Sequence, residues 1–356
     1  MSDQLQQVLY KDAVQLLKRL IATPSFSKEE QGTAAMLVQF LESRNVRVDR
    51  QMNNVWATNK HYDPAKPTLL LNSHHDTVKP NHSYTKNPFV PIETDNKLYG
   101  LGSNDAGGCL VSLMAAFLFF YDKQDMEYNL LFAATAEEEI SGADGIAALL
   151  PGLGTIHAAI VGEPTLMHMA IAEKGLLVLD CETKGIAGHA ARNEGENAIY
   201  NSLQDIEWFQ NYQFAEVSDT LGPVKMSVTM INAGTQHNVV PELCRFTVDV
   251  RVNDCYTNEE IVTEIKRYVN CDVVARSLRL RSTSIDADHD LVKAGRQLGR
   301  NVFGSSTLSD KVFMNFPALK MGPGDSARSH TADEFIYLHE IEEGIDIYIK
   351  MLKQIV

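Results

Sequence analysis

The sequence predicts an α/β protein of two domains, in which a smaller α+β domain is inserted into a larger α/β domain. Three observations support this. The 356 residues exceed the usual size of a single hydrophobic core. Short, wholly apolar segments alternate with helical patterns at both ends of the chain. Between them lies a stretch with the order β-α-β-β-α-β.

The N-terminal segment is expected to be helical. Apolar residues recur at helical spacing over residues 5–21, and Pro24 ends this pattern. Ser27, with Glu30 three places later, has the form of a capping box. The sequence therefore predicts a second helix that begins at Ser27.

Four short apolar segments are expected to form the main sheet. They occupy residues 68–71, 130–135, 158–162 and 318–321, and a helical pattern lies at 108–121. Segments this short and this uniformly apolar suit strands that are covered on both faces. We therefore expect a largely parallel sheet between layers of helices.

The central region is expected to fold as a ferredoxin-like domain. Its strands are predicted at 176–183, 224–231, 244–252 and 272–278, and its helices at 197–213 and 258–269. The first pattern then resumes with a helix at 290–303 and a last helix at 339–355. The boundaries this suggests are 1–174 with 287–356 for the α/β domain and 175–286 for the inserted domain.

Composition excludes several classes of protein. The net charge is −14 and no Lys/Arg-rich run is present, which argues against nucleic acid and anionic membranes as partners. The five cysteines are odd in number and form no C-x-x-C pair, which argues against a disulfide framework and favours a reducing cytoplasm. The N-terminus lacks the features of a secretory signal, and the longest apolar run, 113–121, is far shorter than the ~20 residues of a membrane span. We expect a soluble, cytoplasmic protein.

Acidic and imidazole side chains follow the predicted strands. Ligands of such sheets bind beyond the carboxyl ends of the strands. In chain order these ends carry His74-His75-Asp76, Glu137-Glu138-Glu139, Glu163, and a Gly322-Pro323-Gly324 loop that leads to His330; Asp105 lies in a Gly-rich segment before a predicted helix. Four strand ends thus bring potential ligands to one edge.

These residue types suit a pair of divalent metal ions. Imidazoles together with carboxylates favour Zn, Co or Mn over copper or calcium. One histidine and one terminal carboxylate could serve each ion, with an aspartate shared between them. Two such ions would activate water and polarise a carbonyl group. The adjacent Glu138 and Glu139 can divide the roles of general base and ligand, because neighbouring side chains leave a strand in different directions.

Each motif alone has an ordinary explanation. An H-x-D sequence is usually not a metal site, and three consecutive glutamates often begin a helix. Glu163 before Pro164 could open a turn, and His330 could cap a loop. Their joint position after four apolar strands is harder to explain in this way, so the metal centre is the preferred interpretation.

The motifs resemble a known family over essentially the whole chain. It is the zinc metallopeptidase and deacylase family that contains acetylornithine deacetylase, succinyl-diaminopimelate desuccinylase, aminoacylases and certain carboxypeptidases. The matching segments are 73–78, Asp105, 135–139, 162–165, and 322–324 followed by His330 and Glu334. The resemblance implies a zinc-exopeptidase-like α/β catalytic domain and an inserted lid and dimerisation domain. It further implies two zinc ions, with cobalt or manganese as substitutes.

The resemblance also implies a role for each site residue. The implied metal ligands are His74, Asp105, Glu139, Glu163 and His330, with Asp105 bridging the two ions. Asp76 would orient the His74 imidazole, and Glu138 would act as general base. His75 has no implied chemistry and is interpreted as structural.

Segments of the inserted domain resemble the family's lid. The segment 185–189 resembles the one whose histidine, here His189, reaches the active site of the partner subunit and stabilises the oxyanion. This implies a homodimer formed through the lid domain. Segments 238–241 and 249–251 resemble those that hold the substrate carboxylate, so Asn238 and Arg251 are candidate binders. Arg251 could equally form a structural ion pair.

The substrate implied is a small N-acylated amino acid. The form of 162–165 and of 173–175 looks most like acetylornithine deacetylase, which implies a role in arginine biosynthesis. A succinyl-specific enzyme should offer a further cation to bind the second carboxylate of the succinyl group. Lys174 is the one candidate near the position that the resemblance implies for such a cation. Acetylcitrulline, succinylornithine, succinyl-diaminopimelate and dipeptides remain alternatives. The sequence departs from the family pattern at Gly107, Glu137 and Ser329. Ser329 follows Arg328 in a loop that is expected to face the substrate. These departures leave the substrate preference open.

Two other classes of function compete with this one. A non-catalytic relative should have lost a ligand or the general base, and both are retained here. A two-metal phosphoesterase also uses histidine and aspartate at strand ends, but the lid motifs argue against it.

Overall fold

A computed structural model describes residues 2–192 and 194–356. The chain forms two compact units. The first comprises the residues up to Ile171 together with Ile285–Phe303 and Ser309–Val356, and the second comprises Ala172–Ser284 and Gly304–Leu308. The second unit thus includes a short segment, 304–308, that lies outside the inserted domain expected from the sequence.

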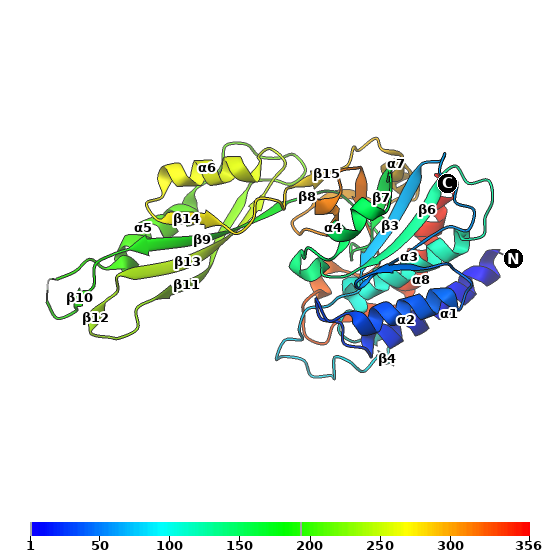
Figure 1. The fold of residues 1–356 in the computed structure, drawn as a ribbon, viewed down its shortest axis with the longest axis horizontal. Coiled ribbons are helices and arrows are strands. Elements are labelled where there is room, and N and C mark those ends of the chain that lie inside the picture. The colour runs from blue at the N-terminus through cyan, green and yellow to red at the C-terminus, as the bar shows by residue number, and fades with distance from the viewer. Residues whose placement is uncertain (1, 193) are drawn as a thin grey trace. The chain divides into compact units, whose positions relative to one another are not determined.

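The first unit is built on a mixed sheet whose centre is parallel (Figure 1). The four central strands, β6, β3, β7 and β17, run parallel to one another, and the strands that flank them pair with them in the antiparallel direction. From one edge the order is β1 (Asp49–Gln51), β2 (Asn54–Thr58), β6 (Asn129–Thr135), β3 (Thr68–His74), β7 (Ala158–Val161), β17 (Ala318–Lys320) and β8 (Met169–Glu173). Every residue of β3, β6 and β7 is buried, because helices cover both faces.

Alternate residues of the central strands enter two different cores. Leu69 and Leu71 face one side and Leu70 faces the other. The larger core also receives the apolar faces of α1 (Ser2–Ile21), α2 (Gln31–Glu42), α3 (Gly108–Phe120), α7 (Asp290–Gln297) and α8 (Leu338–Leu352). The smaller core is closed by α4 (Ile146–Leu149) and the 3₁₀ turn η4 (Asp310–Phe313).

The segment Ser103–Phe120 has the length and apolar character of a membrane span, but 89% of it is buried inside the protein. It consists of the irregular turn η1 (Ser103–Gly107) and α3, which packs against α1, α8 and the sheet. It is therefore the central core helix of the first unit. A small sheet of β4 (Ile92–Thr94), β5 (Lys97–Tyr99) and β18 (Phe335–Tyr337) lies in the same unit.

The second unit has a four-stranded antiparallel sheet in the order β11 (Lys225–Ala233), β13 (Leu243–Val252), β9 (Gly175–Lys184) and β14 (Asp272–Ala275). This is the order of a ferredoxin-like domain, as predicted. Buried and exposed residues alternate along β9 and β13, because α5 (Ala198–Asn211) and α6 (Asn258–Tyr268) cover one face. A ribbon of β10 (Gly188–His189) and β12 (Val239–Val240) carries the predicted lid histidine, and β15 (Thr283–Ser284) pairs with the end of β8.

Two predictions about local structure are wrong. No capping box opens the second helix: α2 begins at Gln31 without a side-chain cap, because the carboxylate of Glu30 accepts hydrogen bonds from the amide of Lys28 and the side chain of Asn53. The helix expected at 290–303 ends at Gln297. Gly299 adopts a φ of 74°, which ends the helical path, and Val302–Ser305 forms strand β16 instead.

Candidate metal centre

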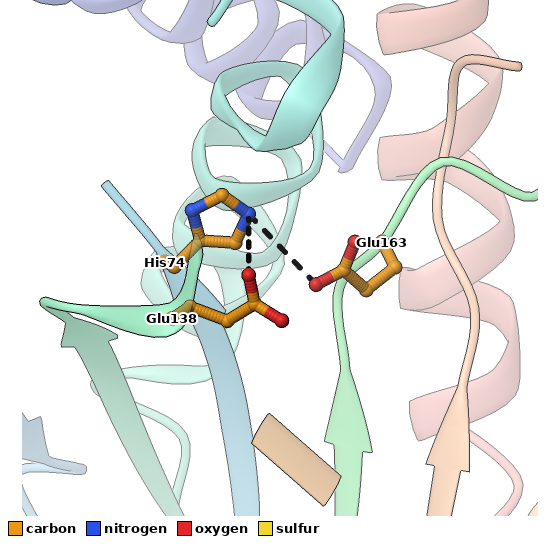
Figure 2. Close-up of side chains that lie close together, drawn as sticks. All are labelled: His74, Glu138 and Glu163. Atoms are coloured by element: carbon orange, nitrogen blue, oxygen red, sulfur yellow. Dashed lines mark ion pairs between the residues drawn. The ribbon is translucent and has the colours of Figure 1, made fainter. Parts of the chain in front are cut away.

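Parallel strands deliver the candidate ligands to one edge of the first unit. His74 is the last residue of β3 and pairs with Thr135, the last residue of β6. Glu138 and Glu139 follow in the turn η2 (Glu138–Ile140), and Glu163 lies two residues after β7. Figure 2 shows the carboxylates of Glu138 and Glu163 directed at one nitrogen of His74.

The first group of ligands surrounds Nε2 of His74. This nitrogen lies 3.3 Å from Oδ1 of Asp105 and 3.8 Å from an oxygen of each of Glu138 and Glu163. His74 is fully buried, whereas the carboxylates retain slight exposure. A second group surrounds Nε2 of His330, which lies 3.0 Å from Oε2 of Glu139 and 3.6 Å from Oδ2 of Asp105.

Asp105 belongs to both groups. Its Oδ1 faces His74 and its Oδ2 faces His330. Zinc with bonds of 2.0–2.1 Å in a tetrahedron would separate its ligand atoms by about 3.3 Å. The observed separations of 3.0 to 3.8 Å bracket that value. The donor set therefore fits two divalent ions that share one aspartate.

The electrostatics of the centre also require positive charge. Burial would lower the pKa of His74, but hydrogen bonds to Asp105 and Asp76 hold this pKa well above its ordinary value. Burial and the nearby charge of Glu163 raise the pKa of Glu138 well above its usual range. The hydrogen bond with Glu139 raises the pKa of His330 to about 9. Without metal ions, protons on these side chains offset the negative charge of the buried carboxylates. Bound cations would take the place of these protons.

Asp76 ties the two ligand segments together. Nδ1 of His74 donates to the backbone oxygen of Asp76 at 3.0 Å and lies 3.3 Å from its carboxylate, so Nε2 is the nitrogen that faces the centre. The same carboxylate accepts hydrogen bonds from the amides of Glu138 and Glu139 at 3.1 and 3.2 Å. The hydroxyl of Ser27 donates to it at 2.7 Å. The residue expected to cap a helix instead holds the Asp76 side chain.

His75 is buried on the far side of the strand end. Its Nε2 donates to the backbone oxygen of Asn53 at 2.9 Å, and its Nδ1 lies 2.9 Å from the hydroxyl of Thr33. Burial lowers the pKa of His75 to about 4. These contacts join α2 and the turn between β1 and β2 to the end of β3, which agrees with a structural role.

Acidification should destabilise the protein through His75. Its folded pKa lies below the unfolded value of about 6.5, so its contribution to stability is complete above pH 6.5 and is lost as the pH falls toward 4. The difference in pKa corresponds to about 3 kcal/mol. Urea unfolding between pH 4 and 7 should show a smaller loss for His75→Gln than for the wild type. His82→Gln, at an exposed histidine, is the control; parallel curves for the wild type and His75→Gln would contradict this expectation.

The candidate lid and substrate residues lie in the second unit. His189 is exposed, and its Nδ1 accepts a hydrogen bond from the amide of Ala191 at 3.1 Å, which makes Nε2 the proton-bearing nitrogen of the neutral ring. The backbone oxygen of Asn238 accepts from the amide of Ala190 at 3.0 Å and so supports the histidine segment. Arg251 makes two hydrogen bonds with Asp249, at 2.8 and 3.0 Å. Lys174 donates to the backbone oxygen of Pro223 at 2.5 Å.

Sequence reasoning missed two buried carboxylates beside the centre. Asp310 accepts a hydrogen bond from Thr135 at 2.6 Å, and burial raises its pKa to about 6. It precedes the strand β17, so a search after strand ends could not find it. Glu334 was noted in a motif but was given no role, and its carboxylate accepts three backbone hydrogen bonds from the Asp105 segment.

The loop before His330 contains Arg328 and Ser329. Arg328 forms a bidentate pair with Glu340, at 3.0 and 2.6 Å, and lies over the ring of Phe335. Burial by itself would raise the pKa of Asp105. Hydrogen bonds from His74 and Ser329 outweigh this effect, so the pKa of Asp105 lies below its ordinary value. Ser329 thus contacts Asp105 directly, whereas Arg328 is held by Glu340 away from the ligand residues.

The first unit has a sheet with a parallel centre, and Asp105 at its carboxyl edge faces two groups of candidate metal ligands. A ferredoxin-like domain is inserted in the chain. Together these features define a metal-dependent hydrolase. The chain belongs to Peptidase family M20/M25/M40, whose model matches residues 70–354. The family predicted from the motifs and the two-domain α/β fold are thereby confirmed.

Curated and solved relatives agree with this assignment. The chain is similar to succinyl-diaminopimelate desuccinylase of Paracoccus denitrificans (strain Pd 1222), with 27% identity over 316 residues that cover 84% of this chain and 78% of that protein. Aminopeptidase PepT from Bacillus cereus ATCC 10987 has a similar fold, with a TM-score of 0.78, 18% identity and coverage of 97% and 98%. The YXEP protein of Bacillus subtilis, described as a dinuclear metal binding peptidase from the M20 family, gives a TM-score of 0.74, 15% identity and coverage of 97% and 98%.

Proposed function

We propose that this protein is a two-zinc hydrolase that cleaves the amide bond of a small N-acyl amino acid. The observation that supports this best is the position of Asp105, whose two carboxylate oxygens face His74 and His330 separately. His74, Glu163 and Asp105 would hold one ion, and His330, Glu139 and Asp105 the other. Cobalt or manganese could replace zinc, because the same nitrogen and oxygen ligands suit them.

Bound at this centre, the two ions would supply an activated water and polarise the acyl carbonyl group. Glu138 accepts the proton of the attacking water and then delivers it to the leaving amine. Its position supports this role, because its carboxylate enters the His74 group while its amide is fixed by Asp76. Asp76 orients His74 and thereby keeps Nε2 directed toward the centre.

The second unit would act as lid and dimerisation domain. His189 of one subunit donates from Nε2 to the oxyanion formed in its partner, a role supported by the backbone hydrogen bond to its Nδ1. Exposed apolar side chains on α5 and β11, including Tyr200, Leu203 and Ile231, offer a surface for a second copy. Asn238 and Arg251 would bind the substrate carboxylate. To do so, the Arg251 guanidinium would have to donate to the substrate in addition to Asp249 or in place of it.

The acyl group is the open choice within this function. The motifs favour acetyl, as in N-acetylornithine deacetylation for arginine biosynthesis in the cytoplasm. The names of curated relatives favour succinyl-diaminopimelate, a step of lysine biosynthesis. The cation considered for a second carboxylate, Lys174, already donates to Pro223. We therefore place N-acetylornithine first and succinyl-diaminopimelate second, with acetylcitrulline, succinylornithine and dipeptides as further candidates.

A hydrolysis screen tests the proposal. Protein loaded with zinc or cobalt should release amine from at least one of N-acetylornithine, N-acetylcitrulline, N-succinylornithine, N-succinyl-diaminopimelate or a dipeptide. A chelator should abolish this activity and added metal should restore it, because the attacking water depends on the ions. Absence of turnover with two ions bound would contradict the proposed function. Hydrolysis of a generic phosphate ester alone would favour a phosphoesterase.

A further inference from the structure

Glu334 is almost entirely buried, with 2% of its surface exposed, and lies immediately before β18. Its Oε1 accepts hydrogen bonds from the amides of Asn104 and Asp105, at 2.8 and 2.9 Å. Its Oε2 accepts from the amide of Gly102 at 3.0 Å. One carboxylate thus serves three backbone donors of the segment that carries Asp105.

The Asp105 segment needs this support because its backbone is irregular. Gly102 has a φ of 73°, and Asp105 has a φ of −116° and a ψ of 101°, so neither residue has helical geometry. Amides in such a segment cannot all be satisfied by a regular helix, and a buried unpaired amide is costly. The Glu334 carboxylate takes the place of the missing helical acceptors.

The same contacts join two ligand-bearing parts of the chain. Glu334 follows His330 by four residues, and its backbone oxygen also accepts from the amide of Gly100 at 3.0 Å. Asn104 adds a second connection, since its side chain exchanges two hydrogen bonds with the backbone of Asp325, at 3.1 and 3.0 Å. The position of the shared aspartate is therefore set from the segment that carries the last histidine.

We propose that Glu334 is a positioning residue of the metal centre: it holds the backbone of Asp105 so that the two oxygens of that side chain face His74 and His330. This inference rests on the proposed function, since it assigns Glu334 to the same metal centre. Glu334 itself touches neither substrate nor metal; it acts through Asp105. Replacing its carboxyl group by an amide should weaken the binding of both ions, because both depend on Asp105.

Glu334→Gln is the direct test. The glutamine amide group would oppose at least one backbone donor, so part of the segment would lose its acceptor. Changes to such supporting residues typically cost 10–100-fold in metal affinity or activity, and we expect a loss of about that size in zinc and cobalt affinity, measured by competition with a chelator. With the substrate that the wild type hydrolyses, kcat should fall by a similar factor of about 10–100 while KM changes little.

Glu340→Gln is the matched control. Glu340 is a carboxylate six residues after Glu334 with slight exposure, and it holds Arg328 rather than the metal segment. This variant should lower the thermal unfolding midpoint but leave metal affinity near the wild-type value. Glu334→Asp keeps the carboxyl group on a shorter side chain and should be intermediate in metal affinity, which keeps the test usable if Glu334→Gln does not fold.

The outcomes separate the two ideas. Wild-type metal affinity and kcat in folded Glu334→Gln would overturn the inference while leaving the proposed function intact. Equal losses of metal affinity in Glu334→Gln and Glu340→Gln would also overturn it, since a general structural effect would then suffice. A wild-type protein that binds no metal would refute the proposed function itself.

Discussion

Glu138→Gln should lower kcat by at least ~100-fold while both metal ions remain bound, because general acid/base catalysis contributes about 10²–10⁴-fold. Glutamine has nearly the same shape but cannot take a proton from water or return one to the amine. The amide of residue 138 would still donate to Asp76, so the turn that carries Glu139 should keep its position. Steady-state kinetics together with metal analysis of the purified variant measure both parts of this expectation.

Glu137→Gln is the control for this experiment. Glu137 is the preceding residue of the same triplet, but its carboxylate accepts a hydrogen bond from the amide of Asp144 and is directed away from the His74 group. Its turnover should stay within a few-fold of the wild type. Near-normal turnover in Glu138→Gln would instead remove Glu138 from the mechanism, and loss of metal from that variant would make it a ligand.

His189→Ala should reduce kcat by about 10²–10³-fold, the usual effect of removing one donor to an oxyanion. The metal centre lies wholly in the first unit, so metal content should not change. KM should change little, because the proposed hydrogen bond strengthens as the oxyanion forms. His237→Ala, in the loop before β12, is a control for loss of an exposed lid histidine.

Mixed dimers test whether His189 acts across subunits. Dimers of Glu138→Gln alone or of His189→Ala alone have no intact site. A hybrid dimer would have one intact site, in which the His189→Ala subunit supplies Glu138 and the Glu138→Gln subunit supplies His189. After free exchange of equal amounts, half of the dimers are hybrids, so activity should recover to about a quarter of the wild-type value if the dimer is symmetric. No recovery despite subunit exchange would mean that His189 serves its own subunit or none.

The core strands could be predicted from the sequence because each is a short apolar segment with an unambiguous pattern. Thr68–His74 and Asn129–Thr135 are buried at every position, as expected of strands covered on both faces. Local features were less predictable. Ser27 and Glu30 have the spacing of a capping box, yet Ser27 donates to Asp76, and Glu30 accepts from the amide of Lys28 and the side chain of Asn53. Asp76 and Asn53 come from distant segments, which local spacing does not indicate.

The candidate site also has residues that the sequence could predict and residues that only the structure reveals. His74, Glu139, Glu163 and His330 lie in segments that follow predicted strands, and parallel strands end at one edge. The resemblance to the family then implied which of these residues are ligands and added Asp105. Asp310 and the role of Glu334 could not be predicted, since one precedes its strand and the other acts on backbone amides. Arg251 suggested carboxylate binding or a structural ion pair, and only the structure reveals its partner Asp249.

By itself the sequence determined the fold class, the family and the chemical type of the centre, because these depend on residue type and order along the chain. The tertiary structure decided which carboxylate oxygens lie near His74 and which lie near His330, with one oxygen of Asp105 facing each histidine. It also decided which buried side chains hold them in place. The physical reason is that a hydrogen bond or a metal geometry depends on distances of a few tenths of an ångström between segments that are remote in sequence, and no local pattern encodes those distances.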